Sequence, residues 1–507
     1  MFASVHSANL VGTTGRAVTV EVHVGDGLPG FTMVGLPDET CREARDRVRA
    51  AILTCGLPWP NRRITVNFAP AGFRKSGIGL DLPLAVGILA ASEVIPVDRL
   101  APYCFIGELG LDGTLRRVPG VAPMVAAIRS EAPGLVPVVP VANVAEASVV
   151  VEGRVEAVTT LVDLVSVLRD GMPWPDVPAE DIVVTSTAEP DLAEVRGQPL
   201  ARQALEVAAA GHHHLLLSGP PGSGKTMLAQ RLPGLLPRLD DRTAIEAMMV
   251  QSAAGVPLPP GGLVRRPPWR APHHTASLIA RVGGGSAALR PGEISLAHGG
   301  TLFMDELGEF PSVVIDALRQ PLEEGVVRVS RARAHAEMPA RVLLIGATNP
   351  CPCGGGRPGE CSCSETAKSK YLRRLSGPLL DRFDLRVWVG RPTAEQLLDA
   401  EPGECSAAVR ERVIAARSLA EQRGHGPNST LSGSDLDEVA PLAPEALDIV
   451  RAELDRGRLS GRGLHRVRRV ARTIADLRGG AHVIGSTEIL LALQMRVDLA
   501  IPAGRGA

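Results

Sequence analysis

One short stretch near the middle of the chain constrains the fold more than any other. Residues 215–218 are apolar except for the final serine, and residues 219–226 fit the pattern G-x-x-x-x-G-K-T. A strand, a glycine-rich turn and a helix in this order form a loop whose backbone N–H groups surround the phosphates of a nucleotide. The expected nucleotide contacts are Gly219, Pro220, Pro221, Gly222, Ser223, Gly224, Lys225 and Thr226.

Two side chains of this phosphate loop, residues 219–226, have separate expected tasks. Lys225 would reach the β- and γ-phosphates of ATP, and the Thr226 hydroxyl would complete the ligand shell of a Mg²⁺ ion. The helix that starts here adds the positive end of its dipole to the site. The alternative is a chance glycine-rich turn, which the strand-like run before the loop and the helical residues 227–229 after it disfavour.

Two later strands are expected to complete this site. Residues 301–304 are a mainly apolar run that ends at Asp305 and Glu306. Asp305 is predicted to hold Mg²⁺, directly or through water, and Glu306 to polarise the attacking water. Residues 342–347 form a further apolar run that ends near Asn349. The amide of Asn349 would orient the same water against the γ-phosphate.

Length and charge limit the remaining possibilities. The 507 residues predict about three domains. The formal net charge of −1 gives no general attraction to nucleic acid, so any such contact has to come from a local patch. The chain has no charge-free apolar run of about 18 residues, and its first residues do not read as a secretory signal. We therefore expect a cytoplasmic protein with no membrane partner.

A basic β-hairpin is predicted between the two strands that follow the phosphate loop. Residues 324–333 alternate polar and apolar, and the chain then turns and runs into residues 338–347. In a ring, such a hairpin would project into the central pore, where its arginines could grip DNA phosphates. A solvated charged turn is the alternative. The arginines placed near the tip are Arg328, Arg331 and Arg333.

A basic stretch also lies in the long connection after the phosphate loop. Residues 265–275 include arginines beside Trp269, which would suit a nucleic-acid backbone. A surface insertion that packs on its own subunit is an equal alternative.

Half of the cysteines gather in one short segment. Four thiolates within 13 residues can enclose one tetrahedral zinc ion, and eight cysteines over this length do not form a disulfide framework. The C-x-C spacing is less usual than C-x₂-C, so four reduced loop cysteines are the alternative. The candidate zinc ligands are Cys351, Cys353, Cys361 and Cys363.

The N-terminal region reads as a mixed α+β unit. Valines at every second position of residues 18–24 predict a half-buried strand, and helices are expected over residues 38–55 and about 80–92. The spacing of Thr40 and Glu43 is that of a capping box at the start of the first helix.

This region resembles a known domain. Residues 80–86, 105–109 and 118–120 are similar to the Lon-protease-type domain fused to bacterial magnesium-chelatase-like ATPases. The resemblance places Asp81 and Ala122 where Lon proteases have a catalytic serine and lysine. Neither side chain can perform that chemistry, so we expect a non-catalytic scaffold or assembly domain. A hydrolase with a different nucleophile is the alternative.

The later motifs carry a second resemblance. Residues 379–385 read Leu-Leu-Asp-Arg-Phe-Asp-Leu, and the order of phosphate loop, acidic strand, hairpin and Asn-ended strand before them resembles the AAA+ ATPases of the magnesium-chelatase class. In that class the arginine of this motif, here Arg382, reaches the nucleotide of the neighbouring subunit. The implied gain in rate is on the order of 10³–10⁵. An ion pair of Arg382 with Asp381 or Asp384 is the alternative.

The C-terminal part is expected to be helical. Residues 460–464 are similar to the lid motif of AAA+ proteins, whose arginine contacts the γ-phosphate; this implies Arg462, with Arg466 as a substitute. The arginines at 466, 469 and 472 are expected to lie largely outside the apolar stripe of this helix. His212, His213 and His214 precede the strand of the phosphate loop, and we expect them near the adenine rather than on a metal.

The predicted fold is α/β: a P-loop AAA+ core with a helical lid, preceded by an α+β Lon-protease-like domain of the ribosomal S5 domain 2-like type. The expected boundaries are 1–172 for the Lon-like domain, 173–190 for a linker, 191–392 for the core and 393–507 for the lid region. Together these features resemble the ComM/YifB family, which implies a hexameric ATP-driven motor that promotes branch migration of DNA. A magnesium-chelatase motor subunit and a protein-remodelling or regulatory ATPase are the alternatives.

Overall fold

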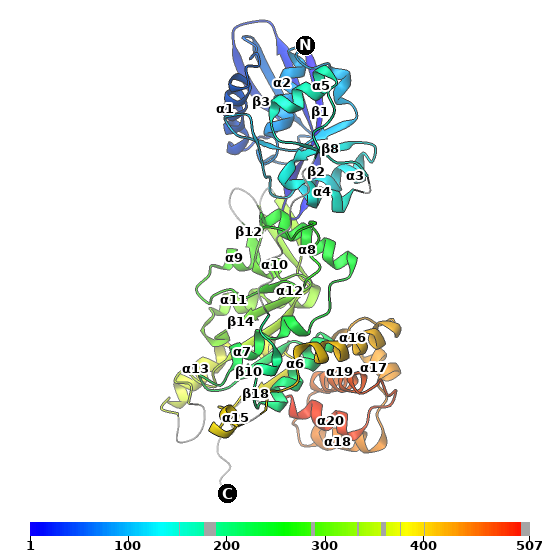
Figure 1. The fold of residues 1–507 in the computed structure, drawn as a ribbon. Helices are drawn as coiled ribbons and strands as arrows, with labels where there is room; N and C mark the ends of the chain where they lie inside the picture. The colour runs from blue at the N-terminus through cyan, green and yellow to red at the C-terminus, as the bar shows by residue number, and fades with distance from the viewer. Residues whose placement is uncertain are drawn as a thin grey trace.

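The computed structural model describes residues 1–151, 153–176, 189–284, 289–331, 334–355, 361–375, 377–399 and 401–497. A domain around a seven-stranded sheet stands at one end, a core around a five-stranded sheet follows, and a group of helices lies beside that core (Figure 1). Of the expected linker, residues 177–188 lie outside the described ranges. Within those ranges, no helix has both the length and the hydropathy that a membrane crossing needs.

The N-terminal sheet has the strand order β3-β4-β2-β1-β5-β8-β9. Its longest strands, β1 (Phe2–Val11) and β2 (Thr14–Gly25), pair antiparallel, and the alternating valines of β2 are buried as predicted. Antiparallel strands with one covered face give this alternation of apolar and polar residues. The other strands are β3 (Gly30–Val34), β4 (Arg63–Ala69), β5 (Tyr103–Phe105), β8 (Val136–Pro140) and β9 (Glu156–Val158), and β6 (Glu108–Leu109) pairs with β7 (Leu115–Arg116).

Helices cover this sheet close to the predicted positions. The first helix, α1, is capped by Asp38, which accepts from the Cys41 N–H at 3.0 Å, so the predicted capping box at Thr40 is wrong. The Thr40 hydroxyl instead donates to Asp38 and accepts from the N–H of Gly77. The helices of this domain are α1 (Glu39–Thr54), α2 (Asp81–Ala91), α3 (Val121–Glu131), α4 (Val144–Val150) and α5 (Leu161–Asp170).

The core is built on a parallel sheet with the strand order β11-β14-β17-β10-β18. Because all its strands run in one direction, the loops that follow them meet at one edge, where ligands of such sheets bind. The three central strands are buried along their whole length, as expected for a sheet covered on both faces. The strands are β10 (Leu215–Ser218), β11 (Trp269–Arg270), β14 (Thr301–Met304), β17 (Leu343–Thr348) and β18 (Leu385–Trp388).

Helices and a hairpin surround the core sheet. Two short helices, α11 and α12, meet at Leu318; Pro321 has no backbone N–H, so it cannot make the hydrogen bond that would continue the first helix. The predicted hairpin is present as β15 (Val326–Arg331) and β16 (Ala334–Pro339). The core helices are α6 (Pro199–Gly211), α7 (Lys225–Ala229), α8 (Asp241–Ala254), α9 (Leu278–Val282), α10 (Glu293–Leu296), α11 (Ser312–Ala317), α12 (Arg319–Glu324), α13 (Glu365–Arg374) and α14 (Gly377–Leu380), and β12 (Gly283–Gly284) pairs with β13 (Arg290–Pro291).

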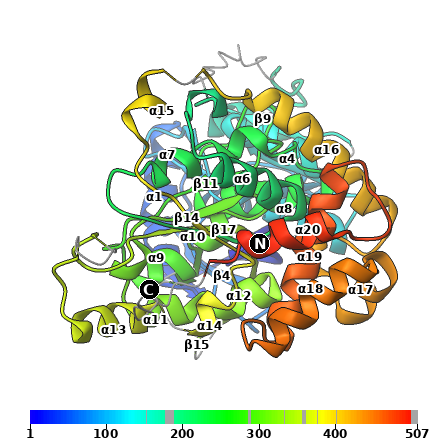
Figure 2. The same cartoon turned by 90° about the horizontal axis from the view of Figure 1, so that it is seen from below.

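The C-terminal helices, defined here as α16–α20, pack on one side of the core, whereas α7 and α13 lie on the other (Figure 2). The apolar stripe of α19 is buried as predicted, but Arg466 and Arg472 are buried with it. They are tolerated there because acidic side chains and carbonyl groups bind their guanidinium groups. After α15 (Ala394–Leu398), these helices are α16 (Ser406–Gln422), α17 (Gly433–Val439), α18 (Pro444–Asp455), α19 (Gly461–Leu477) and α20 (Ser486–Gln494).

The N-terminal domain rests on α8 (Figure 1). It also contacts the hairpin of the core, because the Thr13 hydroxyl donates to the Glu337 carbonyl oxygen of β16 at 3.3 Å. The Gly120 N–H donates to the Ser252 carbonyl at 2.8 Å, and the Ser252 hydroxyl donates to Glu146. Ala122 packs in one apolar cluster with Ala247 and Met248 of α8. A residue expected at the position of a protease lysine is therefore part of an interface between two domains.

Candidate nucleotide-binding site

The phosphate loop connects β10 to α7 in the conformation that its glycines permit. Gly222 and Gly224 have positive φ angles of 73° and 89°, which most residues avoid. A Cβ atom on Gly219 would lie 2.0 Å from the Val389 carbonyl oxygen, so no larger residue fits there. These positions require glycine for backbone reasons, and the resulting loop can direct N–H groups toward an anion.

Lys225 points into this loop. Its Nζ atom donates to the Gly219 and Pro220 carbonyl oxygens at 2.8 and 2.9 Å and to Asn349 Oδ1 at 3.2 Å. Burial lowers the pKa of Lys225, and the negative charge of Asp305 partly offsets this effect. Lys225, at the start of α7, and Asn349, just after β17, are thus brought together at the ends of the neighbouring strands β10 and β17.

The two predicted Mg²⁺ ligands touch one another. Thr226 Oγ1 donates to Asp305 Oδ2 at 2.8 Å, and Asp305 Oδ1 accepts from the Glu306 N–H at 2.9 Å. Hydroxyl and carboxylate oxygens at such a separation suit a Mg²⁺ ion that keeps most of its water ligands. The residues therefore fit the ion that the sequence implies.

Glu306 has an unusual backbone. Its φ and ψ angles are 50° and 46°, the left-handed region that non-glycine residues rarely adopt and that is frequent at functional sites. Its side chain is 55% exposed, and Oε2 lies 3.3 Å from His274 Nδ1. His274 was not predicted as a site residue; the sequence only placed it in the basic stretch 265–275.

These side chains line one cavity of about 470 Å³ at the carboxyl edge of the sheet. It contains residues from the loop, the acidic strand and the Asn-ended strand, which are up to 128 positions apart, from Pro221 to Asn349. Among the described residues, the only lysine or arginine that lines this cavity is Lys225. Its lining residues are Pro221, Gly222, Ser223, Gly224, Lys225, Thr226, Met227, Asp305, Glu306, Ala347, Thr348 and Asn349.

The predicted arginines lie elsewhere. Arg382 precedes β18, whose first residue pairs with the first residue of β10, whereas the phosphate loop follows the last residue of β10. Arg382 therefore lies at the amino edge of the sheet, opposite the phosphate loop. It forms an ion pair with Glu323 of α12, not the predicted alternative pair with Asp381 or Asp384.

Arg462 and Arg466 belong to the same group as Arg382. Burial lowers the pKa of Arg382, and the positive charges of Arg466, Arg462 and Arg319 lower it further, so these cations are close together. Arg462 is exposed near the start of α19. We call Arg382, Arg462 and Arg466 the arginine group. None of its members lines the phosphate-loop cavity.

A second cavity, of about 600 Å³, opens at this amino edge. His212 and His214 line it, on the far side of β10 from the phosphate loop, so the expectation that these histidines lie near the adenine is wrong. The reason is directional: residues before a parallel strand and residues after it reach opposite edges of the sheet. Arg382 and Arg466 also line this cavity.

The four clustered cysteines converge. Their Sγ atoms all lie within 4.8 Å of one another, and three of the pairs are 3.4, 3.5 and 3.6 Å apart. Ligands of a tetrahedral zinc ion with bonds of about 2.3 Å stand about 3.8 Å apart. A hydrogen bond from the Gly355 backbone, followed by those from Cys363 and Cys351, lowers the pKa of Cys353 to about 5. The hydrogen bond with Cys353 raises the pKa of Cys363, so the negative charge gathers on Cys353. The spacing of the four Sγ atoms fits a zinc ion.

The hairpin places its arginines differently from the prediction. Arg328 lies opposite Glu337, three residues before the last residue of β15, and forms ion pairs with Glu337 at 2.8 Å and with Glu324. It is therefore not at the tip. Arg331 ends β15, but its side chain, like the whole of Arg333, lies outside the described residues.

The position that the resemblance gives to a protease nucleophile is fully buried. Asp81 accepts two hydrogen bonds from Arg47 at 2.9 Å and one from the Leu109 N–H at 3.2 Å. Such a bidentate pair is a structural contact, because its oxygens have no access to a substrate.

Comparison with known families agrees with this architecture. A family model described as "Magnesium chelatase, subunit ChlI" matches residues 191–397. Models described as "Subunit ChlI of Mg-chelatase" and "Magnesium chelatase, subunit ChlI C-terminal" match residues 20–143 and 403–496. The parallel sheet, the phosphate loop and these matches define a protein of the magnesium-chelatase-like AAA+ class of ATPases.

Individual relatives match almost the whole chain. Competence protein ComM of Haemophilus influenzae is 43% identical over 482 residues, 94% of each chain. An uncharacterized protein of Mycobacterium tuberculosis is 45% identical over 96% of each chain, and YifB of Escherichia coli is 42% identical over 93% of each. The chain belongs to the ComM/YifB family.

Proposed function

We propose that the protein is a ring-forming ATPase in which each active site is built from two adjacent subunits. One observation carries this proposal: Lys225 and Arg382 lie at opposite edges of the same five-stranded sheet. The charge that develops during phosphoryl transfer needs cations on several sides. Within the described residues of one chain, the phosphate-loop cavity offers only Lys225.

In the proposed site, one subunit supplies the residues that bind ATP and activate water. Lys225 binds the β- and γ-phosphates, and Thr226 and Asp305 hold Mg²⁺, which neutralises phosphate charge. Glu306 accepts the proton of the attacking water, and Asn349 orients that water. Because Lys225 Nζ and Asn349 Oδ1 are hydrogen-bonded, phosphate oxygens that attract Lys225 also release the Asn349 amide for this task.

The neighbouring subunit supplies the arginine group. Arg382 and Arg462 of that subunit would face the γ-phosphate and stabilise the charge of the transition state, an effect on the order of 10³–10⁵ in rate. A contact between two different faces of the same chain is heterologous, and such contacts form a ring when the rotation from one subunit to the next closes. A hexamer is the form that the family resemblance implies. The C-terminal helices act as the lid that moves with hydrolysis.

The proposed substrate of the motor is DNA, moved through the ring during recombination or DNA uptake. Support comes from the basic hairpin β15–β16 and from the name of a relative, competence protein ComM. Arg331 and Arg333 are the proposed phosphate contacts. Arg328 is expected to contribute less, because two glutamates already bind its guanidinium group.

Two further parts have proposed roles outside the chemistry. Residues 1–172 form a Lon-protease-like domain that serves as a non-catalytic docking module, since Asp81 is buried in an ion pair and Ala122 packs against α8. The proposed boundaries of the other parts are 173–190, 191–392 and 393–507. The four clustered cysteines hold a structural zinc ion that ties the segment after β17 together.

The test is ATP turnover in the presence of different partners. Single-stranded DNA, duplex DNA and a four-way junction are compared with an unfolded protein and with a porphyrin plus Mg²⁺, and Lys225→Ala is the inactive control. We expect DNA to raise turnover severalfold, and the junction to be unwound or migrated only with ATP. Stimulation by the porphyrin or the unfolded protein, with none by any DNA, would reject the DNA motor and favour a chelatase or remodelling function.

The hairpin is tested by the salt dependence of DNA binding. Replacing Arg331 and Arg333 with glutamine should reduce the slope of log K against log salt by about 1 for each lost phosphate contact. Arg328→Gln is the matched control, with a smaller expected change. An unaltered slope in the double variant would exclude the hairpin as the contact.

A further inference from the structure

A buried histidine connects the segment that carries Arg382 to the helix that carries Arg462. His213 lies two residues before the first residue of β10 and is fully buried. Its Nδ1 atom lies 2.9 Å from Asp384 Oδ2, two residues after Arg382. Its Nε2 atom lies 2.8 Å from Thr473 Oγ1 on α19. One imidazole ring therefore contacts both the core and the C-terminal helices.

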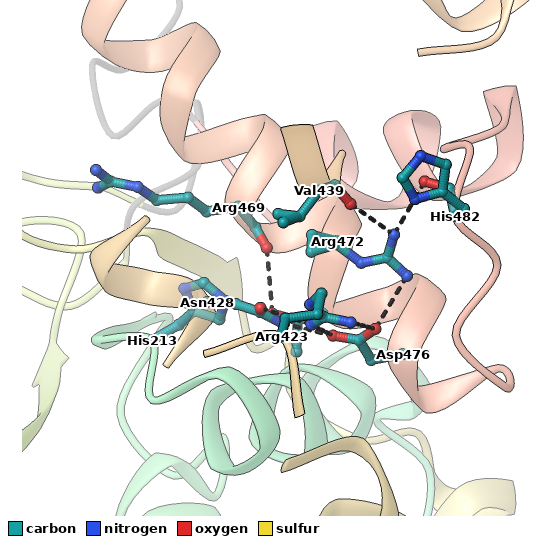
Figure 3. Close-up of polar contacts among 9 residues, drawn as sticks. His213, Arg423, Asn428, Val439, Arg469, Arg472, Asp476 and His482 are labelled. Atoms are coloured by element: carbon teal, nitrogen blue, oxygen red, sulfur yellow. Dashed lines mark hydrogen bonds and ion pairs between the residues drawn. The ribbon is translucent and has the colours of Figure 1, made fainter. Parts of the chain in front are cut away.

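The contact continues into a buried polar network within the C-terminal helices (Figure 3). Asn428 donates to Thr473 Oγ1 at 3.1 Å and to Asp476 Oδ2 at 2.8 Å. Asp476 also binds Arg423 through two hydrogen bonds, at 2.9 and 2.5 Å, and Arg472 at 2.9 Å. Arg472 in turn donates to the Val439 and His482 carbonyl oxygens. Asn428 thus joins Thr473, the partner of His213, to the charged groups around Asp476.

Both ring nitrogens of His213 are used. The Asp384 carboxylate can only accept, so Nδ1 donates to it. The Thr473 hydroxyl can donate to Nε2 or accept from it, and it also lies within hydrogen-bond distance of the Arg469 carbonyl oxygen, at 3.1 Å, and of the Asn428 amide. His213 therefore bridges Asp384 and Thr473 in either arrangement.

A second contact joins the same two elements. Arg466 Nε lies 3.5 Å from Asp384 Oδ1, the oxygen that His213 does not use. Arg466 is four residues after Arg462, so both lie on one face of α19. Asp384 consequently binds both His213 and Arg466. Each contact holds the segment that carries Arg382 against α19.

The close approach of His213 and Thr473 also depends on the residue at 211. A Cβ atom on Gly211 would lie 2.3 Å from His213 Nε2 and 2.4 Å from Thr473 Oγ1. The end of α6 therefore has no side chain at the one place where it would separate the two groups.

We propose that His213 is a positioning residue for the arginine group. By binding Asp384 and Thr473 at once, it holds the Arg382 segment and α19 as one unit, so that Arg382 and Arg462 reach the neighbouring subunit's nucleotide together. This inference rests on the proposed sharing of the active site between subunits. It predicts that a subunit altered at His213 loses its ability to supply arginines but keeps its ability to bind and activate ATP.

The test variant is His213→Asn in the full-length protein. The asparagine amide can still reach Asp384 but is too short for Thr473. Alone, the variant should lose at least tenfold in kcat, while its KM for ATP and its nucleotide affinity change by less than about threefold. His212→Asn is the matched control, because His212 has a left-handed backbone that asparagine tolerates and contacts neither partner of His213. Wild-type kcat in His213→Asn would overturn the proposal.

Mixed rings separate positioning from general damage. Mixed with Lys225→Ala, which has intact arginines, His213→Asn should recover turnover at interfaces that combine its own phosphate loop with the arginines of its neighbour. Mixed with Arg382→Ala, it should recover none. Recovery in both mixtures would overturn the proposal. Recovery in neither would also overturn it, provided that Arg382→Ala and Lys225→Ala restore turnover when they are mixed with one another. If that last control mixture fails, the shared site itself is rejected.

A second variant protects the test against misfolding. Thr473→Val has nearly the same shape as threonine and breaks the link from the α19 side, while the His213 contact with Asp384 stays intact. The same pattern of recovery is expected in the same mixtures. A pattern that matches Lys225→Ala instead, with recovery only beside Arg382→Ala, would show that the link serves the phosphate loop and would contradict the proposal.

Discussion

A single histidine should make the folded core sensitive to mild acid. His214 Nδ1 accepts a hydrogen bond from the Leu344 N–H at 3.1 Å, so a proton on this nitrogen would place two hydrogens against each other. Burial lowers the pKa of His214 from 6.5 to about 4; the negative charge of Asp384 opposes this effect, and the positive charges of Arg382 and Arg466 add to it.

The sign and size of the effect follow from linkage. The unfolded chain takes up a proton at His214 as the pH falls through about 6.5, whereas the folded chain does so only near pH 4. Acidification between these values therefore favours the unfolded chain. From about pH 7.5 to about pH 5, this one group should lower the free energy of unfolding by about 2 kcal/mol.

The assay compares the wild type with His214→Asn. The Oδ1 atom of asparagine can take the place of Nδ1 as acceptor but does not titrate in this range. Urea unfolding is followed by the fluorescence of Trp269 and Trp388, which belong to the core sheet, with Trp59 and Trp174 replaced by phenylalanine. The loss of stability between the two pH values should be about 2 kcal/mol smaller in His214→Asn. Equal losses in both proteins would refute the reasoning.

Three further perturbations have defined outcomes. Glu306→Gln should retain ATP without turnover, measured as bound nucleotide after gel filtration; undiminished turnover would mean that another group activates the water. Purified protein should contain one zinc ion per chain by metal analysis, and Cys353→Ser should weaken its retention against a chelator; a metal-free wild type would end that assignment. Arg47→Ala leaves the Asp81 carboxylate buried without its partner and should destabilise the N-terminal domain by about 3 kcal/mol in thermal or urea unfolding; an unchanged midpoint would show that the pair is dispensable.

Much of the nucleotide site could be predicted because its signals are local. The glycines of the phosphate loop indicate positive φ angles. The apolar runs that precede Asp305 and Asn349 indicate buried parallel strands, whose carboxyl ends lie at one edge of the sheet. Sheet geometry then brings together residues far apart in the sequence. The amphipathic stripe of α19 and the alternation of β2 were predictable for the same reason: burial of one face imposes a period.

The features that the sequence did not predict have a common cause: they depend on residues that are distant in the sequence and close in the fold. Helix α8 was not predicted, because its buried residues do not form a single stripe, although Asp240 caps it and Gly255 ends it. The burial of Arg472 depends on Asp476 and on carbonyl groups of other segments. The place of His213 depends on Asp384 and Thr473, which are 171 and 260 residues away. No local pattern marks such partners.

The central claim is that one chain holds only half of each active site. It is tested most directly by measuring ATP turnover per subunit across a wide range of protein concentration, with the mass of the assembly recorded in the same samples. The account predicts that turnover per subunit rises as rings form and falls toward zero in dilute samples that contain only monomers. Constant turnover per subunit down to the monomer would contradict it.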